Sequence, residues 1–415
     1  MPRLALPLIV LIWLCSPTLA VCQEENPASS SDGPLLVDTN SHLVVMEYEA
    51  WFGPEAVTFQ GTAAMPLLQS PDMQSVGGGY DSADPAVIQN HVDRMQALDV
   101  DAAIADLTNN VACIFNSEWF VRHYVSYCTP AFRRFNQTIR DNTGNLFPAW
   151  TSLGARLKII PLLGGSDDNV MYKDLDGKTA LEKEIEYFGA LFQQYPQRQV
   201  IYLGKPLMLI FLGAAQDPNR ADHPLWARIR QFLAAHPELS GNYTFRLMPG
   251  YIDSQPGLWL HQGPPDGPVE VSPEYGFWSW VDRLNPTCTL PQCPYYPSYN
   301  RAGSRVENLT ASIATAGQYG WGCATNSAAL PYCPDDSLRF GANDVYVTFN
   351  AFMVYARELR PIFLILHQFN EFVPPDEGWN ANTDDDIEPA NLWGLSALEA
   401  VGAQIRNYRD TALLP

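Results

Sequence analysis

Short apolar runs alternate with amphipathic or polar segments along most of this chain. Runs of roughly four to eight residues rich in Val, Ile and Leu are typical of strands in a parallel sheet buried on both faces. Eight runs are strand candidates: 43–49, 102–106, 157–163, 207–212, 243–248, 276–280, 311–315 and 362–366. Helices are predicted at 84–98, 178–195, 223–235, 342–359 and 391–409. This alternation predicts an α/β fold, a single (β/α)8 or TIM barrel.

Several connecting segments are too long to be simple turns. They span 52–83, 107–155, 251–275 and 284–308. Loops of this length usually carry function or are disordered. We expect them as elaborated loops on the C-terminal face of the barrel, where TIM barrels keep their active sites. The stretch 107–155 gives no clear strand or helix pattern.

The first 20 residues have the features of a secretory signal. Arg3 gives a positive start, residues 4–14 are mostly apolar, and Thr18-Leu19-Ala20 offers small residues for cleavage. The apolar run is too short to span a bilayer, and Cys22 leaves a lipoprotein signal as an alternative. We therefore expect a secreted protein without membrane association. Its parts would be a signal peptide at 1–20, a flexible leader at 21–40 and the barrel domain at 41–415.

The composition narrows the range of partners. The chain has 415 residues and a net charge of −20, and 47% of its residues are hydrophobic. This acidic balance argues against nucleic acid or an anionic membrane as a partner. Aromatic residues make up 12% of the chain, so some can form flat apolar surfaces for sugar rings. The Walker, Rossmann, zinc-protease and Gly-x-Ser-x-Gly signatures are absent. We expect a monomer that takes a carbohydrate substrate and needs no cofactor or metal.

Cysteines and sequons fit an exported chain. Seven cysteines follow the signal segment, and export implies an oxidising compartment. The simplest pairing is local, with Cys22 left over, although sequence alone does not fix the connectivity. The local pairs would be Cys113–Cys128, Cys288–Cys293 and Cys323–Cys333. Asn136, Asn242 and Asn308 head Asn-x-Thr triplets, which predict a glycoprotein.

The strongest candidates for chemistry follow the last predicted strand. Glu371 comes directly after it, so the carboxylate should project at the mouth of the barrel. Glu377 lies six positions further on, across a Pro-Pro pair that holds the loop in a defined shape. Two carboxyl groups near an aromatic surface are typical of glycosidic bond cleavage. The alternatives are a salt-bridged rim carboxylate for Glu371 and a solvated loop acid for Glu377, with Asp376 as its competitor.

Further candidates surround this pair as substrate contacts. They are Tyr48, Glu49, Trp51, Asp106, Trp278, Trp280, Asn370 and Trp379. At most one of Glu47 and Glu49 is expected to point inward, with Tyr48 on the opposite face. Core packing is the default interpretation for Trp278 and Trp280, whereas the loop residue Trp379 is the better sugar platform.

Three more polar groups have structural interpretations. We expect His367 to be a buried, hydrogen-bonded histidine. The acidic run 384–386 lacks the ligand spacing of a calcium loop and is interpreted as a solvated cluster. Glu388 is expected at the start of the closing helix, where the helix dipole favours a carboxylate.

Segments in this order resemble glycoside hydrolase family 99. Gln368-Phe-Asn-Glu371, Glu377-Gly378 and Asp386-Ile-Glu-Pro389 are similar to the family's Asn-Glu-Trp-x-Glu-Gly and Ile-Glu-Pro signature. Gly204-Lys-Pro206 and Tyr48-Glu-Ala-Trp51-Phe-Gly53 are similar to its Gly-Lys-Pro and to the aromatic segment that ends its first strand. The likeness covers about a third of the chain. Here the two glutamates lie further apart than in the family, and Phe372 replaces its tryptophan.

The resemblance implies a (β/α)8 barrel that hydrolyses α-linked glycans with net retention. Carried over, Glu371 would engage the sugar 2-hydroxyl and Glu377 would be the general acid/base. A non-catalytic carbohydrate-binding protein on the same scaffold is the alternative, because the spacing of the glutamates is altered. A polysaccharide lyase is a third option.

Overall fold

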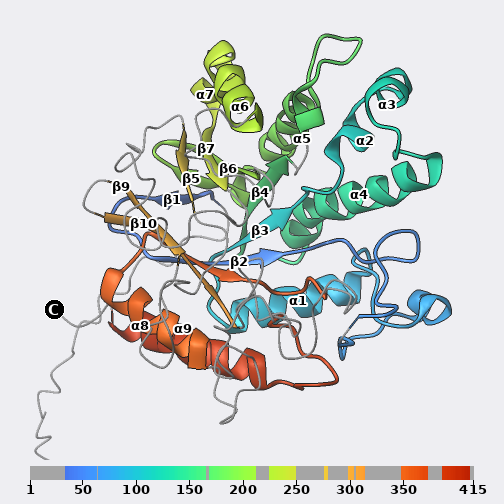
Figure 1. The fold of residues 1–415 in the computed structure, drawn as a ribbon. Coiled ribbons are helices and arrows are strands. Elements are labelled where there is room, and N and C mark those ends of the chain that lie inside the picture. The colour runs from blue at the N-terminus through green and yellow to red at the C-terminus, as the bar shows by residue number, and fades with distance from the viewer. Residues whose placement is uncertain are drawn as a thin grey trace, which may run out of the picture. The chain divides into compact units, whose positions relative to one another are not determined.

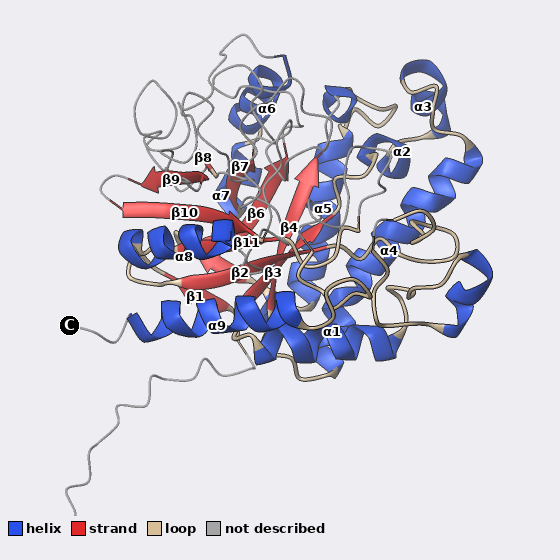
Figure 2. Ribbon diagram, turned by 60° about the horizontal axis from the view of Figure 1, so that its bottom comes forward, coloured by secondary structure: helices blue, strands red, loops and turns tan. Residues whose placement is uncertain are grey.

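The computed structural model describes most of the chain beyond the N-terminal segment. The described ranges are 33–62, 64–164, 168–211, 224–248, 275–278, 298–302, 305–313, 347–372 and 386–411. The strands are β1 (Leu35–Val37), β2 (Leu43–Tyr48), β3 (Ala102–Asp106), β4 (Lys158–Gly164), β5 (Val200–Tyr202), β6 (Lys205–Phe211), β7 (Thr244–Met248), β8 (Tyr275–Phe277), β9 (Ser298–Ala302), β10 (Arg305–Ser312) and β11 (Phe363–His367). Helices flank these strands in both views (Figures 1 and 2).

The strand pairing is that of a (β/α)8 barrel. Eight strands follow one another in parallel, in the order β8, β7, β6, β4, β3, β2, β11 and β10. A closed barrel of eight strands needs eight neighbouring pairs, and seven of them are present in the described part of the chain. The pair β8–β10 is not formed between described residues. The fold prediction is confirmed, although β10 pairs at its other edge with β9, in the antiparallel sense, and the described strands do not close the ring between β8 and β10.

Alternate side chains of each strand serve two separate cores, because successive side chains of a strand point to opposite faces. Val44 and Met46 of β2 belong to the core between sheet and helices, whereas Leu43 and Val45 belong to the core inside the barrel. Both faces are apolar, which explains why the sequence shows continuous apolar runs rather than alternation. The two cores together fix which side chains can reach the barrel interior.

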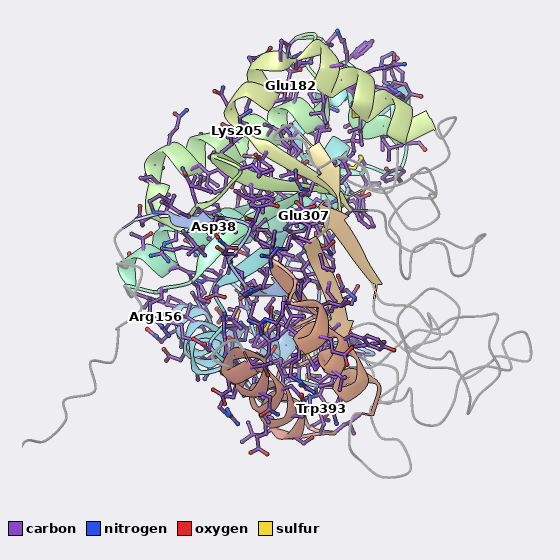
Figure 3. All side chains as sticks on the ribbon, turned by 90° about the vertical axis from the view of Figure 1, so that its left-hand side faces the viewer. Asp38, Arg156, Glu182, Lys205, Glu307 and Trp393 are labelled. Carbon is purple, nitrogen blue, oxygen red and sulfur yellow. A yellow bond between two sulfur atoms is a disulfide. The ribbon has the colours of Figure 1, made fainter. Side chains whose placement is uncertain are left out.

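The inside of the barrel contains a buried ion pair beside the seam between β8 and β10. Arg246 of β7 donates from Nε to Oε1 of Glu307 on β10 at 2.8 Å, and both side chains are fully buried. Glu307 lies among the strands in Figure 3. Trp278, which follows β8, packs on Phe363 of β11 with ring centroids 4.6 Å apart. These interior contacts connect strands on either side of the seam.

A short hairpin-like layer closes the N-terminal end of the barrel. β1 pairs in parallel with β5, and β5 pairs antiparallel with the beginning of β6. Val37, Val200 and Tyr202 belong to the interior core. Lys158 at the start of β4 donates from Nζ to the carbonyls of Gly33 and Gln197. Residues 35–37 are therefore ordered as a strand, which corrects their expected place in a flexible leader.

The helices follow the strands as a barrel requires. They are α1 (Pro85–Ala97), α2 (Val111–Phe115), α3 (Glu118–Tyr124), α4 (Pro130–Ser152), α5 (Ala180–Gln194), α6 (Pro224–Ala235), α7 (Pro237–Asn242), α8 (Val347–Leu359) and α9 (Ser396–Thr411), with 3-10 turns η1 (Pro71–Val76), η2 (Asp168–Met171) and η3 (Pro196–Arg198). The Asp84 side chain caps α1 by accepting from the Ala86 amide, as the Asp-Pro sequence predicts. Within the described ranges, no helix is long and apolar enough to cross a membrane.

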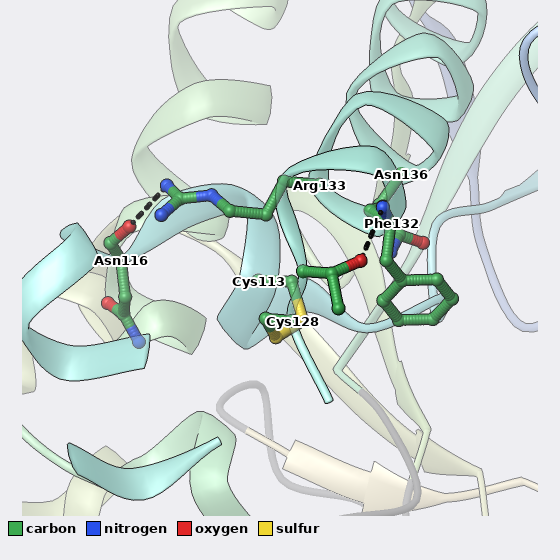
Figure 4. Close-up of a disulfide and its surroundings, with 7 residues drawn as sticks. Cys113, Asn116, Cys128, Phe132, Arg133 and Asn136 are labelled. Atoms are coloured by element: carbon green, nitrogen blue, oxygen red, sulfur yellow. Dashed lines mark hydrogen bonds between the residues drawn. A yellow bond between two sulfur atoms is a disulfide. The ribbon is translucent and has the colours of Figure 1, made fainter. Parts of the chain in front are cut away.

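The region without a clear sequence pattern is helical and cross-linked. It forms α2, α3 and α4, and the predicted disulfide Cys113–Cys128 joins α2 to the segment just before α4 (Figure 4). Arg133 donates to the Asn116 carbonyl at 3.0 Å beside this bond (Figure 4). The other predicted pairs, with Cys22, lie outside the described residues, as do residues 1–32 of the expected signal and leader.

Two of the three sequons are unsuited to glycosylation. Asn136 is fully buried in α4, where its Nδ2 donates to the Phe132 carbonyl at 3.0 Å (Figure 4). Asn308 is fully buried in β10. An N-glycan needs a surface asparagine, so the prediction is wrong for these two positions. Asn242, at the end of α7, is exposed, so it remains a predicted glycosylation site.

Candidate active site

Acidic side chains gather at the C-terminal ends of three neighbouring strands. Glu47 lies near the end of β2 and Glu49 directly follows it, Asp106 ends β3, and Glu371 follows β11. The strand order β3-β2-β11 places these ends side by side. We call Glu47, Glu49, Asp106 and Glu371 the carboxylate cluster. Its position matches that of active sites in (β/α)8 barrels.

Both glutamates of β2 face the barrel interior. Residues two apart in a strand share a face, and Glu47 and Glu49 continue the interior series of Leu43 and Val45. The expectation that at most one of them points inward is therefore wrong. Glu47 is fully buried and its Oε2 is hydrogen-bonded to Nδ1 of His367, which ends β11. The prediction that His367 is a buried, hydrogen-bonded histidine is confirmed.

Glu49 is held by its backbone while its carboxyl group stays in the cluster. Its amide donates to Asn370 Oδ1, and Asn370 Nδ2 donates to the Glu49 carbonyl, both at 2.9 Å. The Glu49 side chain is 2% exposed, and its Oε2 has no hydrogen-bond partner among the described residues. Burial, together with the charges of Glu371 and Asp106, raises the pKa of Glu49 well above its ordinary value. Burial and these neighbouring charges therefore favour the neutral form of this carboxyl group.

Asp106 has a similarly perturbed carboxyl group. Burial and the nearby charge of Glu47 raise its pKa to about 7, although the Thr108 amide, which donates to Asp106 Oδ1, favours the charged form. Trp51 Nε1 donates to the Asp106 carbonyl at 3.1 Å. Trp51 is half-buried, so its ring is fixed against the end of β3 and remains part-exposed there.

Glu371 is the part-exposed member of the cluster. Burial raises the pKa of its carboxyl group to about 7, and the charges of Glu47 and Asp106 act in the same direction. His367 and a hydrogen bond from Gln368 Nε2 act against this rise. The Glu371 side chain is half-buried, whereas the other three carboxylates are at most 2% exposed. A half-buried carboxyl group that titrates near neutrality can exchange a proton with a substrate.

Asp386 holds the backbone that carries Glu371. The amides of Glu371 and Phe372 both donate to its carboxylate, the second at 2.8 Å. Asp386 is 1% exposed, so the interpretation of this position as part of a solvated cluster is wrong. The buried role of Asp386 could not be predicted, because the sequence does not show which of the three acids in this run turns inward.

A second hydrogen-bonded group lies behind the cluster. Glu388 accepts from the Tyr80 hydroxyl at 2.8 Å and is hydrogen-bonded to His91 Nε2 at 3.1 Å. His91 Nδ1 and the Tyr48 hydroxyl are 3.0 Å apart, and Asn370 Nδ2 lies 2.9 Å from the Tyr80 hydroxyl. We call Tyr48, Tyr80, His91, Asn370 and Glu388 the rear network. It connects α1 to the backbone of Glu49.

The rear network corrects two expectations. Glu388 is fully buried and precedes α9 by several residues, so it is not at the start of the closing helix. Tyr48 lies on the outer face of β2, at 1% exposure, with its ring against His91 and Phe369. This placement separates Tyr48 from the carboxylate cluster, and we leave it out of the proposed site. Asn370 is also fully buried, so it acts on Glu49 rather than on a substrate.

The other predicted residues divide into one core residue and three undescribed ones. Trp278 is 1% exposed and packs on Phe363, which agrees with its default interpretation as a core residue. Glu377, Trp280 and Trp379 lie outside the described residues. In the part of the chain that the structure covers, no group of three or more His, Cys, Asp or Glu side chains is arranged to hold a metal ion.

Sequence reasoning missed several residues of the site. Tyr80 and His91 carry the rear network, and Glu184 of α5 accepts from the Gly164 amide at the end of β4 at 2.9 Å. Burial raises the pKa of Glu184 well above its ordinary value. His91 had a usable signal, because it lies on the buried face of α1 with Ile88, Val92 and Met95. A polar residue on the apolar face of a helix needs a buried partner.

Comparisons with known proteins give structural similarity only. No protein-family profile and no curated protein sequence matches the chain. A GH99 endo-α-mannosidase from Bacteroides thetaiotaomicron is similar at 13% identity, over 90% of this chain and 98% of that one, with a TM-score of 0.49. An exo-β-1,4-mannosidase from Opitutaceae bacterium strain TAV5 is similar at 12% identity, over 91% and 63%, with a TM-score of 0.46. An α-L-fucosidase from Paenibacillus thiaminolyticus is similar at 11% identity, over 89% and 74%, with a TM-score of 0.34. At these values the fold assignment rests on the strand pairing in this chain.

Proposed function

We propose that the chain is a secreted glycoside hydrolase that cleaves α-linked glycans. The observation that carries this proposal is the carboxylate cluster at the C-terminal ends of β2, β3 and β11. Within it, Glu371 combines partial exposure with a pKa of about 7. Glycoside hydrolysis depends on carboxyl groups kept in different protonation states by their surroundings.

The surroundings of the carboxyl groups support different roles for each of them in catalysis. A base is most effective when its pKa lies near the working pH, which suits Glu371 to take a proton from a sugar hydroxyl. The family resemblance points to the 2-hydroxyl for this step and to Glu377 as the group that protonates the leaving oxygen. Glu47 and Asp106 stay within the cluster as buried acids that raise the pKa of Glu371, and Glu49 and Asp106 contact the sugar. Net retention of configuration is part of the proposal.

The fixed backbone around Glu371 supports the same assignment. Asp386 accepts from two consecutive amides at this point, and Asn370, the preceding residue, is bonded to Glu49 on the neighbouring strand. A catalytic group needs its position held to a fraction of an ångström by surrounding hydrogen bonds. A salt-bridged rim carboxylate would need a cation, and no Lys or Arg side chain makes an ion pair with Glu371 among the described residues.

The test is hydrolysis of a panel of α-glucans, α-mannans and fungal or algal wall glycans. Cleavage is measured as the release of reducing ends. Glu371→Gln and Glu377→Gln should each lower kcat/KM by about 10²–10⁴-fold. Glu358→Gln on α8, where the side chain is exposed, is the matched control and should keep wild-type activity. Full activity in both site variants contradicts the assignment. Saturable glycan binding without cleavage would indicate a carbohydrate-binding protein, and an unsaturated product that absorbs in the ultraviolet would indicate a lyase.

A further inference from the structure

The Tyr80 hydroxyl contacts the residue that precedes Glu371. Tyr80 lies in the long connection between β2 and α1. Its hydroxyl donates to Glu388 Oε2 at 2.8 Å and accepts from Asn370 Nδ2 at 2.9 Å. These directions follow from the partners, because a carboxylate can only accept and an amide nitrogen can only donate. Asn370 is therefore held by the β2–α1 connection as well as by the backbone of Glu49.

The residue that follows Glu371 is held by the same connection. Phe372 packs edge-on against Phe59 and Phe52, with ring centroids 5.3 and 6.2 Å apart. Phe59 in turn packs on the Tyr80 ring, at 4.9 Å between centroids. These four side chains are at most 1% exposed. Close-packed buried rings leave little room for movement, so the chain is fixed on both sides of Glu371.

The carboxylate that accepts from Tyr80 is itself anchored to α1. Glu388 Oε1 is hydrogen-bonded to His91 Nε2 at 3.1 Å, and Arg94 Nη1 lies 3.9 Å from the same oxygen. Both of these residues belong to α1, and Glu388 is fully buried. The position of α1 is thus transmitted to Asn370 through only two side chains, those of Glu388 and Tyr80.

We propose that Tyr80 is a positioning residue for Glu371. This inference rests on the proposed function, in which Glu371 takes a proton from a sugar hydroxyl. Tyr80 is fully buried, so it acts through its neighbours. Its hydroxyl acts through Asn370, and its ring acts through Phe59 and Phe372. A displacement of about 1 Å at a catalytic group can cost about 10²-fold in rate, so a residue that fixes the backbone of the base affects catalysis without touching the substrate.

Tyr80→Phe tests this role, because it removes the hydroxyl and keeps the ring. Asn370 then loses one of its bonds, and we expect the Glu371 carboxyl group to move toward water. Burial is the main cause of its raised pKa, so the midpoint of its titration should move from about 7 to lower pH by about one unit. The measurement is the rate at which a water-soluble carbodiimide and glycine ethyl ester modify Glu371 as the pH is varied, since the protonated carboxyl group is the reactive form. Fragment mass spectra assign the modification to Glu371.

The variant leaves the charges around Glu371 in place. Among the described residues, the charged or titratable groups near Glu371 are Glu47, Glu49, Asp106, His367 and Asp386. Tyr80→Phe replaces none of them, so a changed midpoint reports a movement of Glu371 rather than a lost charge. If Tyr80→Phe does not fold, Phe59→Leu replaces it, because it also changes no charge and removes the ring between Tyr80 and Phe372. The same direction of shift is expected.

Tyr408→Phe is the matched control. Tyr408 of α9 is also fully buried, and its hydroxyl donates to the Pro361 carbonyl at 3.2 Å, before the N-terminal end of β11. A general effect of losing a buried hydroxyl would appear in both variants. Tyr408→Phe should leave the midpoint of Glu371 unchanged.

Hydrolysis gives a second readout wherever the wild type cleaves a glycan. Tyr80→Phe should then lower kcat by about 10–100-fold with KM within about twofold of wild type, while Tyr408→Phe keeps both values. An unchanged midpoint, or a wild-type kcat, in folded Tyr80→Phe overturns the positioning role. A wild type that cleaves no glycan, with a midpoint that still shifts in Tyr80→Phe, contradicts the proposed function but supports the fixing of Glu371 by Tyr80.

Discussion

The Asn370 side chain is hydrogen-bonded to both backbone groups of Glu49, with Oδ1 accepting from the amide and Nδ2 donating to the carbonyl. The two residues are 321 positions apart in the chain, yet they follow β2 and β11, which are neighbours in the sheet. The Asn370 side chain thus takes the place of backbone hydrogen bonds between strands, just beyond the point where β2 and β11 stop pairing.

Replacing Asn370 should therefore destabilise the protein. Asn370→Leu leaves the Glu49 amide and carbonyl buried without partners, at an expected loss of roughly 1–3 kcal/mol in the free energy of unfolding. Urea denaturation of the purified variant measures this loss. Asn391→Ala is a matched control, because Asn391 also accepts from a backbone amide, that of Met65, but at the surface. Equal losses in the two variants would contradict a special role for Asn370.

The pH dependence of hydrolysis should report the pKa of Glu371. A group that acts as a carboxylate is inactive when protonated, so kcat/KM should rise as the pH passes about 7. Asp106→Asn removes a negative charge that raises the pKa of Glu371, so the midpoint should move to lower pH. His367→Gln removes a group that lowers this pKa, so the midpoint should move to higher pH. Shifts in the same direction for the two variants would contradict this account.

Asp106 should make the protein less stable as the pH rises. Its pKa is about 7 in the folded state, against 3.8 as the ordinary value, so the folded protein holds a proton that the unfolded chain releases. The free energy of unfolding should fall between about pH 4 and pH 7 and level off above. Asp106→Asn removes this term, so its stability relative to wild type should rise by roughly 2–4 kcal/mol from pH 4 to pH 8. Urea denaturation at the two pH values is the measurement. A difference in unfolding free energy between variant and wild type that is the same at both pH values would contradict the prediction.

The buried pair Arg246–Glu307 predicts a strongly non-additive double-mutant cycle. Glu307→Leu leaves the Arg246 guanidinium buried without its counter-charge, for which a loss of roughly 3–5 kcal/mol in the free energy of unfolding is expected. Arg246→Met should behave similarly. The double variant Arg246→Met with Glu307→Leu removes both charges and should lose less than either single variant. Denaturation midpoints of all four proteins decide this; a double variant whose loss equals the sum of the single losses would show that the two residues act independently.

The strands of the barrel were predictable where both faces are apolar. β3 agrees with its predicted range, and β2, β4, β6, β7 and β11 differ only at their ends. The predicted strand 311–315 overlaps only the end of β10, because Glu307 and Thr310 are polar and yet buried inside the barrel. β1 and β5 have three residues each, too few to give a pattern.

The candidate site was predictable in position but not in its connections. Glu371, Glu49 and Asp106 follow from their places after apolar strands. Tyr80 and Glu388, by contrast, lie 308 positions apart and meet only through the fold. Tyr48 was kept as a candidate substrate contact, because its neighbours in the sequence do not show which set of alternating residues turns inward. Only the packing of α1 against β2 decides that.

The β1–β5 layer limits how far the protein can be truncated from its N-terminus. Leu35–Val37 and the carbonyl of Gly33 are structural parts of the base of the barrel, through β5 and Lys158. A recombinant form that begins after Val37 would expose the apolar base formed by Val200 and Tyr202 to water, and we expect it to aggregate. Cloning should therefore start before Gly33, even though the barrel strands themselves begin at Leu43.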